Sequence, residues 1–446
     1  MTSDNTMVNA FDPSRGSGPD PADRELIARR DKALGPAYRL FYEEPLHLVR
    51  GEGVWLYDKT GRAWLDAYNN VASLGHSHPK VVEAVTCQLG TLNTHTRYLH
   101  EGVVNYAERL LAKLPDTLGH VMFTCTGSEA NDLALRIARS FTRRQGVIVT
   151  SLAYHGLTEA VAEISPSLGS FVSRGPRMRS IPAPDPLRVP PAEQGARLAA
   201  DLAQAIAALR ADGIEPAAFI VDTIFSSDGV YPDPAGFLKP AVDLIRAEGG
   251  LFIADEVQPG FARTGETFWG FERHKILPDI VTMGKPMGNG FPLAGLAIRP
   301  ELVAEFGAKA RYFNTFGGNP VAAAAGMAVL DVIGQEGLQE NAREMGAFLK
   351  RGMEEICAGR EDISAIRGAG LFLAVECTAN RESNAPDAAL ASHIVNHMRR
   401  NGILISATGP GANVLKIRPP LVLKRAEAQI LLDGLQAALE DRPKGS

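Results

Sequence analysis

The sequence predicts an α/β protein with a mostly parallel sheet and a second, smaller α+β unit. Between residue 79 and about 325, helical patterns alternate with short apolar runs, as in parallel strands joined by helical crossovers. After residue 330 this alternation gives way to a long helix, strands around a Gly-rich turn, and another helix. With 446 residues and 45% hydrophobic content, the chain is long enough for two or three domains.

The larger unit is expected to span residues 79–328. Within it, the stretch 164–194 holds many of the prolines and is predicted to be an irregular loop. Its strands are predicted at 121–125, 147–151, 218–222, 251–255 and 279–283, and its helices at 79–91, 103–114, 129–141, 195–212 and 238–247.

Two flanking segments carry α+β patterns. Residues 36–78 include a run, Leu46 to Asp58, that alternates like strands around a Gly turn. Residues 1–35 are expected to form a flexible arm, because the start of the chain is polar and rich in Pro, Gly and Asp. In the segment 329–446, helices are predicted at 338–358 and 387–401, and strands within 363–377 and near 403–406 and 414–417.

Charge and composition exclude several classes of partner. The net charge is −5 with both signs mixed, which gives neither a basic footprint for nucleic acid nor a polybasic membrane patch. No apolar stretch reaches the roughly 20 residues of a membrane span. The four cysteines lack metal-binding spacing, so we expect free thiols, no metal and a reducing, cytoplasmic location.

Three functional groups follow predicted strands and together indicate a cofactor. Lys285 follows Ile280 to Met283, Asp255 ends an apolar run, and the pair Gly127–Ser128 opens a helix after a third run. Pyridoxal phosphate (PLP) needs an amine for a Schiff base, a carboxylate for its pyridinium proton, and a helix N-terminus for its phosphate.

Each group also has a structural interpretation. Ser128 fits an ordinary helix N-cap, Asp255 a capping aspartate, and Lys285 a lysine in a surface loop. Glu256 is the alternative acid, but neighbours along a strand point to opposite faces. In Tyr154–His155 the aromatic ring can lie on a pyridine ring, whereas no second ligand stands near His155 for a metal.

The order and spacing of these segments resemble the class III, ω-type aminotransferases among the fold type I PLP enzymes. The resemblance covers roughly residues 38–440. It is carried by Gly75-His76-Ser77-His78-Pro79, Thr126-Gly127-Ser128-Glu129-Ala130-Asn131, Tyr154-His155-Gly156, Ala254-Asp255-Glu256-Val257-Gln258, Met283-Gly284-Lys285, Asn314-Thr315-Phe316-Gly317-Gly318-Asn319-Pro320 and Arg418-Pro419-Pro420-Leu421.

The resemblance implies a seven-stranded, mostly parallel sheet and a small domain that combines the N- and C-terminal segments. It implies that Lys285 carries the Schiff base and moves protons, and that Asp255 is the pyridinium partner. It also implies a homodimer, with a dimer of dimers as an alternative. The other residues expected to bind PLP are Gly127, Ser128, Tyr154, His155, Asp222, Gln258 and, across the dimer, Thr315; Asn131 is expected to support Asp222.

Departures from the family pattern concern the substrate. Asp222 and Ser227 stand where many members have two glutamates, and Lys416 stands where a switching arginine is usual. A lysine is a point charge, whereas an arginine forks onto carboxylate or phosphate. The candidates for binding the substrate are therefore Arg418, Lys416, Arg97 and, in Asn69-Asn70-Val71, Asn70.

The segments Asn69–Val71, Leu92–His100 and Val414–Pro420 resemble a branch with alanine–glyoxylate aminotransferase 2-like proteins and ethanolamine-phosphate phospho-lyases. The sequence is also similar to the diaminobutyrate aminotransferases. We expect ping-pong transfer from an amino or diamino acid, such as 2,4-diaminobutyrate, to a 2-oxo acid through a Lys285 aldimine. The alternative is elimination of phosphate from a small phosphorylated amine. A catalytically inactive binding protein is disfavoured because Lys285, Asp255 and the phosphate turn are all present.

Overall fold

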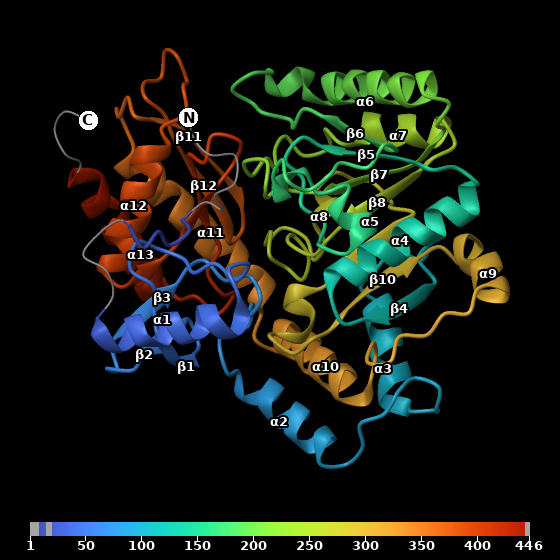
Figure 1. The fold of residues 1–446 in the computed structure, drawn as a ribbon, viewed down its shortest axis with the longest axis horizontal. Coiled ribbons are helices and arrows are strands. Elements are labelled where there is room, and N and C mark those ends of the chain that lie inside the picture. Colours follow the sequence, from blue (N-terminus) through green and yellow to red (C-terminus); the bar gives the residue numbers. More distant parts are fainter. Residues whose placement is uncertain (1–8, 15–19, 442–446) are drawn as a thin grey trace.

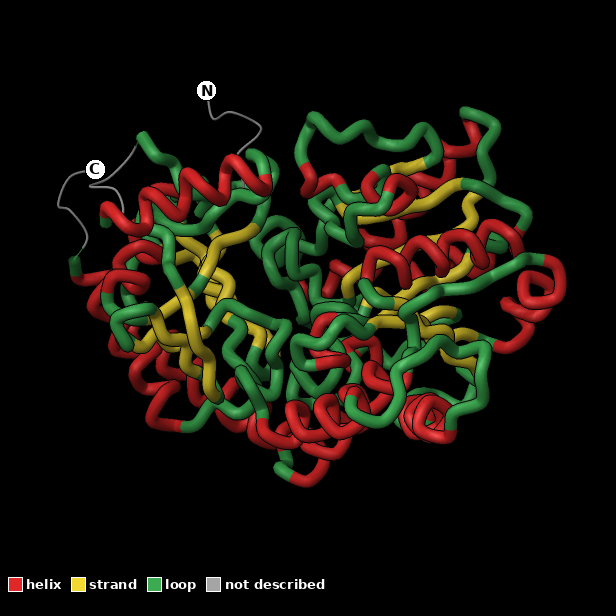
Figure 2. The backbone as a smooth tube through the Cα atoms, turned by 60° about the horizontal axis from the view of Figure 1, so that its bottom comes forward, coloured by secondary structure: helices red, strands yellow, loops and turns green. Residues whose placement is uncertain are grey.

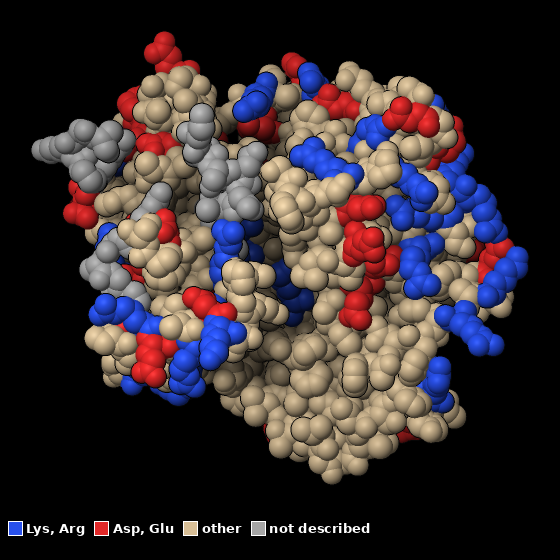
Figure 3. All heavy atoms as spheres, viewed as in Figure 1, with Lys and Arg blue, Asp and Glu red and all other residues tan. Residues whose placement is uncertain are grey.

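The computed structural model describes residues 9–14 and 20–441. Its strands form two groups, a large sheet on one side of the molecule and two smaller sheets on the other (Figures 1 and 2). Over the lower end, around α10, the face shown in Figure 3 is largely free of charged side chains.

The large sheet has seven strands and confirms the predicted α/β class. Only β10 runs antiparallel to its neighbours, β4 and β9; the other neighbouring strands are parallel. The order across the sheet is β4 (His120–Thr124), β10 (Ala294–Ile298), β9 (Ile280–Met283), β8 (Leu251–Asp255), β7 (Pro216–Asp222), β5 (Gly146–Thr150) and β6 (Met178–Ile181).

Helices cover the sheet, which explains why its strands are apolar runs rather than alternating patterns. Every residue of β5, β8, β9 and β10 is buried. Helix α4 packs against the middle strands, while α10 packs against α2 and α3. The helices are α2 (Pro79–Leu89), α3 (Glu101–Leu111), α4 (Gly127–Thr142), α5 (Glu159–Ala162), α6 (Gln194–Ala211), α7 (Lys239–Ala247), α8 (Gly270–Arg273), α9 (Pro300–Lys309) and α10 (Pro320–Gln335).

The two smaller sheets have four strands each. One sheet pairs N-terminal strands with a C-terminal strand, in the order β1 (Leu48–Glu52), β2 (Trp55–Asp58), β3 (Ala63–Asp66) and β13 (Ile403–Leu404). The other has the order β11 (Ile363–Ala369), β12 (Phe372–Cys377), β15 (Val414–Ile417) and β14 (Ser406–Thr408), and the accompanying helices are α11 (Leu338–Ile356), α12 (Ala388–Arg400) and α13 (Arg425–Glu440).

Three expectations need correction. Part of the expected flexible arm is helix α1 (Pro21–Leu34), which begins with Asp20 capping the Asp23 N–H and with Pro21 in the first turn; residues 1–8 and 15–19 lie outside the described residues. The loop predicted at 164–194 contains strand β6. The boundary expected at residue 328 falls inside α10, which continues without a break.

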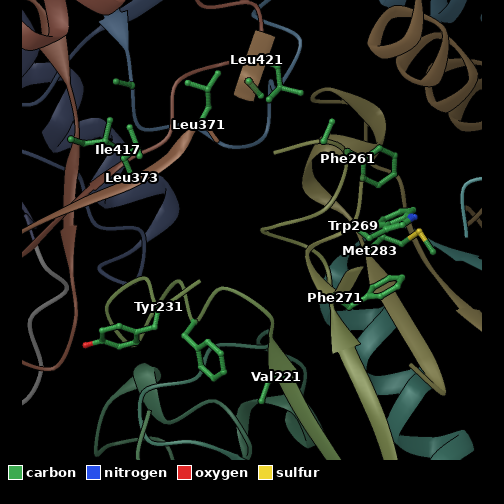
Figure 4. Close-up of a cluster of buried hydrophobic side chains, with 14 of the residues drawn as sticks. Val221, Tyr231, Phe261, Trp269, Phe271, Met283, Leu371, Leu373, Ile417 and Leu421 are labelled. Carbon is green, nitrogen blue, oxygen red and sulfur yellow. The ribbon is translucent and has the colours of Figure 1, made fainter. Parts of the chain in front are cut away.

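One apolar core joins the two groups of strands. Figure 4 shows Leu371, Leu373 and Ile417 on one side and Phe261, Trp269 and Met283 on the other, all members of the same buried cluster. Within the described residues, no single helix is long and apolar enough to cross a membrane; α10 and α11 pass that test only as a pair, bent by 62°.

Candidate active site

Strand register brings three polar side chains to the same edge of the large sheet. Asp222 at the end of β7 pairs with Asp255 at the end of β8, and Asp255 pairs with Thr282 in β9. Because these strands are parallel, their carboxyl ends lie together, where α/β sheets bind ligands. Lys285 follows β9 by two residues and therefore lies at this edge.

Asp255 is held by two buried side chains from neighbouring elements. Its Oδ2 lies 2.7 Å from His155 Nδ1 and accepts a 2.9 Å hydrogen bond from Asn131 Nδ2, while its Oδ1 accepts one from the Val257 N–H. Asn131 lies in α4 and its Oδ1 accepts a 2.6 Å bond from Thr282. The expectation that Asn131 supports Asp222 is therefore wrong, because its amide is aligned with Asp255 instead.

Glu256 points away from this edge, as strand alternation predicts. Its carboxyl oxygens accept hydrogen bonds from the Thr223 hydroxyl and the N–H groups of Gly270 and Phe271 at the start of α8. The side chain is fully buried, and this burial raises the pKa of Glu256 to about 8. Glu256 thus links the end of β8 to Thr223 and to the start of α8. Of the two neighbouring acids, Asp255 is the one that lines the cavity.

Lys285 begins a short 3₁₀ turn, Lys285–Gly288, with a φ of +31°. This backbone conformation is rare for a residue with a side chain and is found preferentially at functional sites. Burial lowers the pKa of Lys285; the Asp255 charge opposes this effect and the Arg418 charge adds to it. The lowered pKa raises the fraction of free amine available as nucleophile and base.

The opposite end of the site is formed by the start of α4. The side chains of Thr126 and Glu129 make a capping box. The first N–H groups of the helix, at Gly127 and Ser128, have no acceptor inside the helix and face an anion favourably. A Cβ on Gly127 would lie 3.0 Å from the Val257 side chain. A larger residue at position 127 would therefore crowd the space in which an anion can reach these N–H groups.

A cavity of about 100 Å³ joins these groups. It contains every residue that the sequence analysis expected to bind the cofactor, except Thr315. Tyr154, 39% exposed, lies at its border, and the Ser128 hydroxyl accepts a hydrogen bond from the Leu157 N–H. The lining residues are Gly127, Ser128, Tyr154, His155, Gly156, Asp222, Asp255, Val257, Gln258 and Lys285.

A basic group lies behind Gln258. Arg418 Nη1 and Asn70 Nδ2 both donate to Gln258 Oε1, at 3.0 Å each. Arg418 is buried, with its guanidinium 5.0 Å from the Tyr68 ring centre. Burial lowers the pKa of Lys416 well below its usual value, and the nearby Arg418 charge adds to this effect. Two of the four candidate substrate residues, Arg418 and Asn70, thus bond to a side chain that lines the cavity, and a third, Lys416, is near Arg418.

Two predicted residues are not brought to this cavity. Arg97 lies in the exposed connection between α2 and α3, with its guanidinium 3.8 Å from the Phe313 ring centre. Thr315 is exposed in the segment before α10. Neither residue lines this cavity in a single chain. The role of Thr315 was expected across a dimer, and the roles of both residues remain predictions.

Arg263 is a buried residue near the site that was not expected from the sequence. This arginine is fully buried and donates from Nη1 to the carbonyl oxygens of Leu371 and Pro419. Burial and the nearby Arg418 charge lower the pKa of Arg263 to about 9. Arg263 follows only two apolar residues, Phe261 and Ala262, and precedes Thr264 and Gly265, so the local sequence gives no signal of its burial.

These residues fit PLP on structural grounds. A lysine with a lowered pKa lies near an aspartate held by Asn131, and the free N–H groups of a helix start lie in the same cavity. Buried His155 Nε2 has no hydrogen-bond partner among the described residues, which leaves a donor or acceptor for a ligand. Fold and site together define a fold type I, PLP-dependent enzyme.

Comparison with known proteins specifies the family. The chain belongs to the class-III aminotransferases, whose family model matches residues 41–439. It is 40% identical to a Drosophila melanogaster protein named alanine–glyoxylate aminotransferase 2-like, covering 93% of this chain and 87% of that one. It is 39% identical to Arabidopsis thaliana alanine–glyoxylate aminotransferase 2 homolog 2, mitochondrial, covering 96% and 90%.

Solved structures agree with this assignment. A phospholyase from Arthrobacter, in complex with phosphoethanolamine, superposes with a TM-score of 0.90 at 43% identity. The match covers 94% of this chain and 100% of that one. The family therefore includes relatives named for two different outcomes, transamination and phosphate elimination.

Proposed function

We propose that the protein is an aminotransferase that moves an amino group from an anionic amino or diamino acid to a 2-oxo acid in two ping-pong half-reactions. 2,4-Diaminobutyrate is the first donor to test. The observation that carries the proposal is the combination of Lys285 with two nearby basic side chains, buried Arg418 and half-buried Lys416. The family membership supports the reaction class.

Bound PLP supplies an electron sink that acidifies the C–H bond beside the substrate nitrogen. Lys285 would hold the cofactor through its Nζ, and its lowered pKa suits it to act as the base that removes and returns this proton. Asp255, whose carboxylate is fixed by His155 and Asn131, would hold the proton on the ring nitrogen. Gly127 and Ser128 would bind the phosphate at the start of α4.

Arg418 and Lys416 would hold the substrate anion. Both side chains lie among buried groups, and Arg418 Nε has no hydrogen-bond partner among the described residues. An unpaired buried cation is costly, and an anionic ligand would remove much of that cost. Gln258 and Asn70 orient the guanidinium of Arg418 through the shared oxygen Oε1.

The experiment is a donor panel assayed for both products. The purified PLP enzyme would be incubated with 2,4-diaminobutyrate, 4-aminobutyrate, alanine or phosphoethanolamine, with and without a 2-oxo acid. Aminotransfer predicts that an amino acid donor converts the cofactor to its pyridoxamine form, and that the 2-oxo acid reverses the conversion. Failure of every amino acid donor to produce this form would contradict the proposal.

Phosphate elimination is the second candidate, favoured by the 43% identity to the Arthrobacter phospholyase. A phosphate dianion also suits Arg418 with the neighbouring Lys416, because the dianion would favour the charged form of the lysine. Release of one phosphate per phosphoethanolamine consumed, without a pyridoxamine form, would establish this alternative. The two outcomes use the same lysine and differ in the group that leaves the substrate.

We further propose a homodimer in the cytoplasm, with a dimer of dimers as the alternative assembly. Large exposed apolar side chains beside Thr315, such as Phe316 at 69% exposure, support a subunit interface. The four cysteines are free, as expected in a reducing compartment. Since the Arabidopsis relative is named as mitochondrial, imaging or fractionation is the test of location.

A further inference from the structure

A cluster of potential metal ligands lies where α12 meets the end of α13. Helix α12 buries an apolar face that includes Leu390, Ile394 and Val395, and α13 packs against it. Figure 1 shows both helices on the side of the molecule away from the large sheet. The cluster is therefore separate from the cavity that contains Lys285.

His393 and His397 are one helical turn apart, so their side chains lie on the same face of α12. Their ring centres are 5.9 Å apart. Asp441 immediately follows α13, and its Oδ2 lies 3.0 Å from His397 Nδ1. One nitrogen of each histidine and one oxygen of Asp441 all lie within 4.8 Å of one another.

His393 provides an independent indication of a missing ligand. Its Nε2 is buried and has no hydrogen-bond partner among the described residues. A buried polar atom without a partner is costly, and a bound cation would satisfy it. The nearby arginines are directed elsewhere: Arg399 Nη1 lies 2.5 Å from Glu44, and Arg400 Nη1 lies 3.4 Å from Glu43.

We propose that His393, His397 and Asp441 bind a divalent cation of the zinc type, with water completing the coordination. Two imidazoles and one carboxylate suit Zn²⁺ and related transition metals, whereas Ca²⁺ and Mg²⁺ prefer oxygen ligands. Tetrahedral Zn²⁺ with bonds of about 2.0–2.2 Å needs its ligand atoms closer than 4.8 Å. Small side-chain rotations on α12 would close this difference.

The proposed site departs from the expectation that the chain has no metal site, and the binding experiment below decides between the two. Asp441 is 44 residues from His397, so no short sequence motif contains all three ligands. Metal binding would connect α12 to the end of α13 and so hold the C-terminal helix in place. This role is structural, and it is independent of whether the enzyme performs transamination or elimination.

The test is Zn²⁺ binding to full-length, tag-free, PLP-loaded protein after removal of metals with a chelator. Competition with a zinc indicator would give stoichiometry and affinity, and thermal unfolding would report stabilisation by Zn²⁺. We expect one Zn²⁺ per chain at this site. His397→Asn should weaken its binding by at least about tenfold, and the double variant His393→Asn/His397→Asn should lose it and the thermal shift.

His47→Asn is the matched control. His47 Nδ1 makes the same 3.0 Å contact with an aspartate, Asp23, but belongs to no such three-ligand group among the described residues. The His47→Asn variant should bind Zn²⁺ with the affinity of the wild type and show the same thermal shift on Zn²⁺ binding. The proposal fails if the double variant, with a wild-type unfolding temperature in chelator, still binds Zn²⁺ as the wild type does, or if the wild type binds none.

Discussion

Burial moves the pKa values of the acids and bases around the cavity in opposite directions. It lowers the pKa of Lys285 and raises that of Glu256 to about 8 and that of Asp228 to about 6. Each shift favours the neutral form of the group, because a charge loses hydration when it is buried. The lysine is thereby prepared for bond formation, whereas the two acids retain protons at mildly acidic pH.

Lys285→Ala should abolish covalent attachment of the cofactor while leaving the protein folded. Turnover should fall by about 10²- to 10⁴-fold or more, because the variant loses both the nucleophile and the proton carrier. Steady-state rates and the visible absorption of the lysine-linked cofactor measure these effects. Lys309→Ala, which removes an exposed lysine paired with Glu305, is the control; near-normal turnover in Lys285→Ala would refute the assignment.

Glu256 makes a testable contribution to the pH dependence of stability. Because its pKa in the folded protein is about 8, above the usual 4.5, the folded state retains a proton that the unfolded state loses. The contribution of Glu256 to the free energy of unfolding is therefore complete below pH 4.5 and is lost as the pH rises toward 8. The loss is at most about 1.4 kcal/mol per pH unit.

Glu256→Gln should remove this slope, because glutamine does not titrate. The measurement is chemical unfolding of wild type and variant between about pH 5 and 8. The free energy of unfolding of the wild type should fall relative to that of the variant as the pH rises. Glu83→Gln, at an exposed position, is the control; a constant difference between wild type and Glu256→Gln would contradict the assignment.

Arg418→Gln tests the anion site without burying a new charge. The kcat/KM for an anionic donor should fall by about 10- to 100-fold, the usual range for losing a hydrogen bond to a charged group. The value for butylamine should change far less. Arg351→Gln, at an exposed position of α11, is the control. A larger effect from Arg97→Gln would instead place the anion site at the connection between α2 and α3.

Sequence could predict the residues whose chemistry stands out at strand ends, but not their neighbours. Lys285, Asp255 and Gly127 each follow an apolar run, and the structure brings them to one cavity. Asn131 and Arg263 gain their surroundings from contacts across the fold: Asn131 bonds to Asp255, and Arg263 bonds to the Pro419 carbonyl. Such long-range contacts have no local sequence pattern.

At the scale of elements, the turn after β5 closely approaches the start of α4. Gly156 has a φ of +139°, and a Cβ on it would lie 2.4 Å from Ser128 Oγ. Glycine is therefore required for two reasons, a backbone conformation that other residues rarely adopt and the absence of space. The contact fixes Ser128 beside the predicted phosphate position.

Gly156→Ala should weaken cofactor binding, because Ser128 or the turn must move. Backbone strain of this kind costs about 1–3 kcal/mol. If the strain is present only when the cofactor is bound, the affinity for the cofactor should fall by roughly 10- to 100-fold. Gly213→Ala is the matched control: its φ is +73°, but no atom lies within 4 Å of the new Cβ. Equal cofactor dissociation constants in the two variants would show that the contact with Ser128 is unimportant.

Most strands with continuous apolar runs were predicted, although β10, which is apolar and fully buried, was not; β6, which is defined by pairing, was also missed. β5, β7, β8 and β9 lie within a few residues of their predicted ranges, because burial on both faces requires apolar residues. β6 has the sequence Met-Arg-Ser-Ile, which is half polar, and it forms by pairing with β5. Its edge position permits such a sequence, so local propensity did not identify it.

For the whole molecule, a group of exposed apolar side chains supports the proposed contact between two subunits. Leu99 is fully exposed, Tyr98 is 66% exposed and Leu92 is 47% exposed, all in the connection between α2 and α3. Phe316, beside Thr315, is 69% exposed. The uncharged face at the lower end of Figure 3 lies in the same part of the molecule as α2, α3 and α10. Large apolar surfaces of this kind typically mark subunit contacts.

Leu99→Glu should therefore weaken the proposed dimer, because it places a charge in an interface that excludes water. If Thr315 of the partner subunit reaches the cofactor phosphate, the resulting monomer should also retain less PLP and lose activity. Light scattering after size-exclusion chromatography, with cofactor absorbance, measures both effects across a dilution series. Leu277→Glu, at 52% exposure elsewhere on the surface, is the control and should behave as wild type. A fully active, cofactor-loaded monomer would separate catalysis from assembly and remove Thr315 from the site.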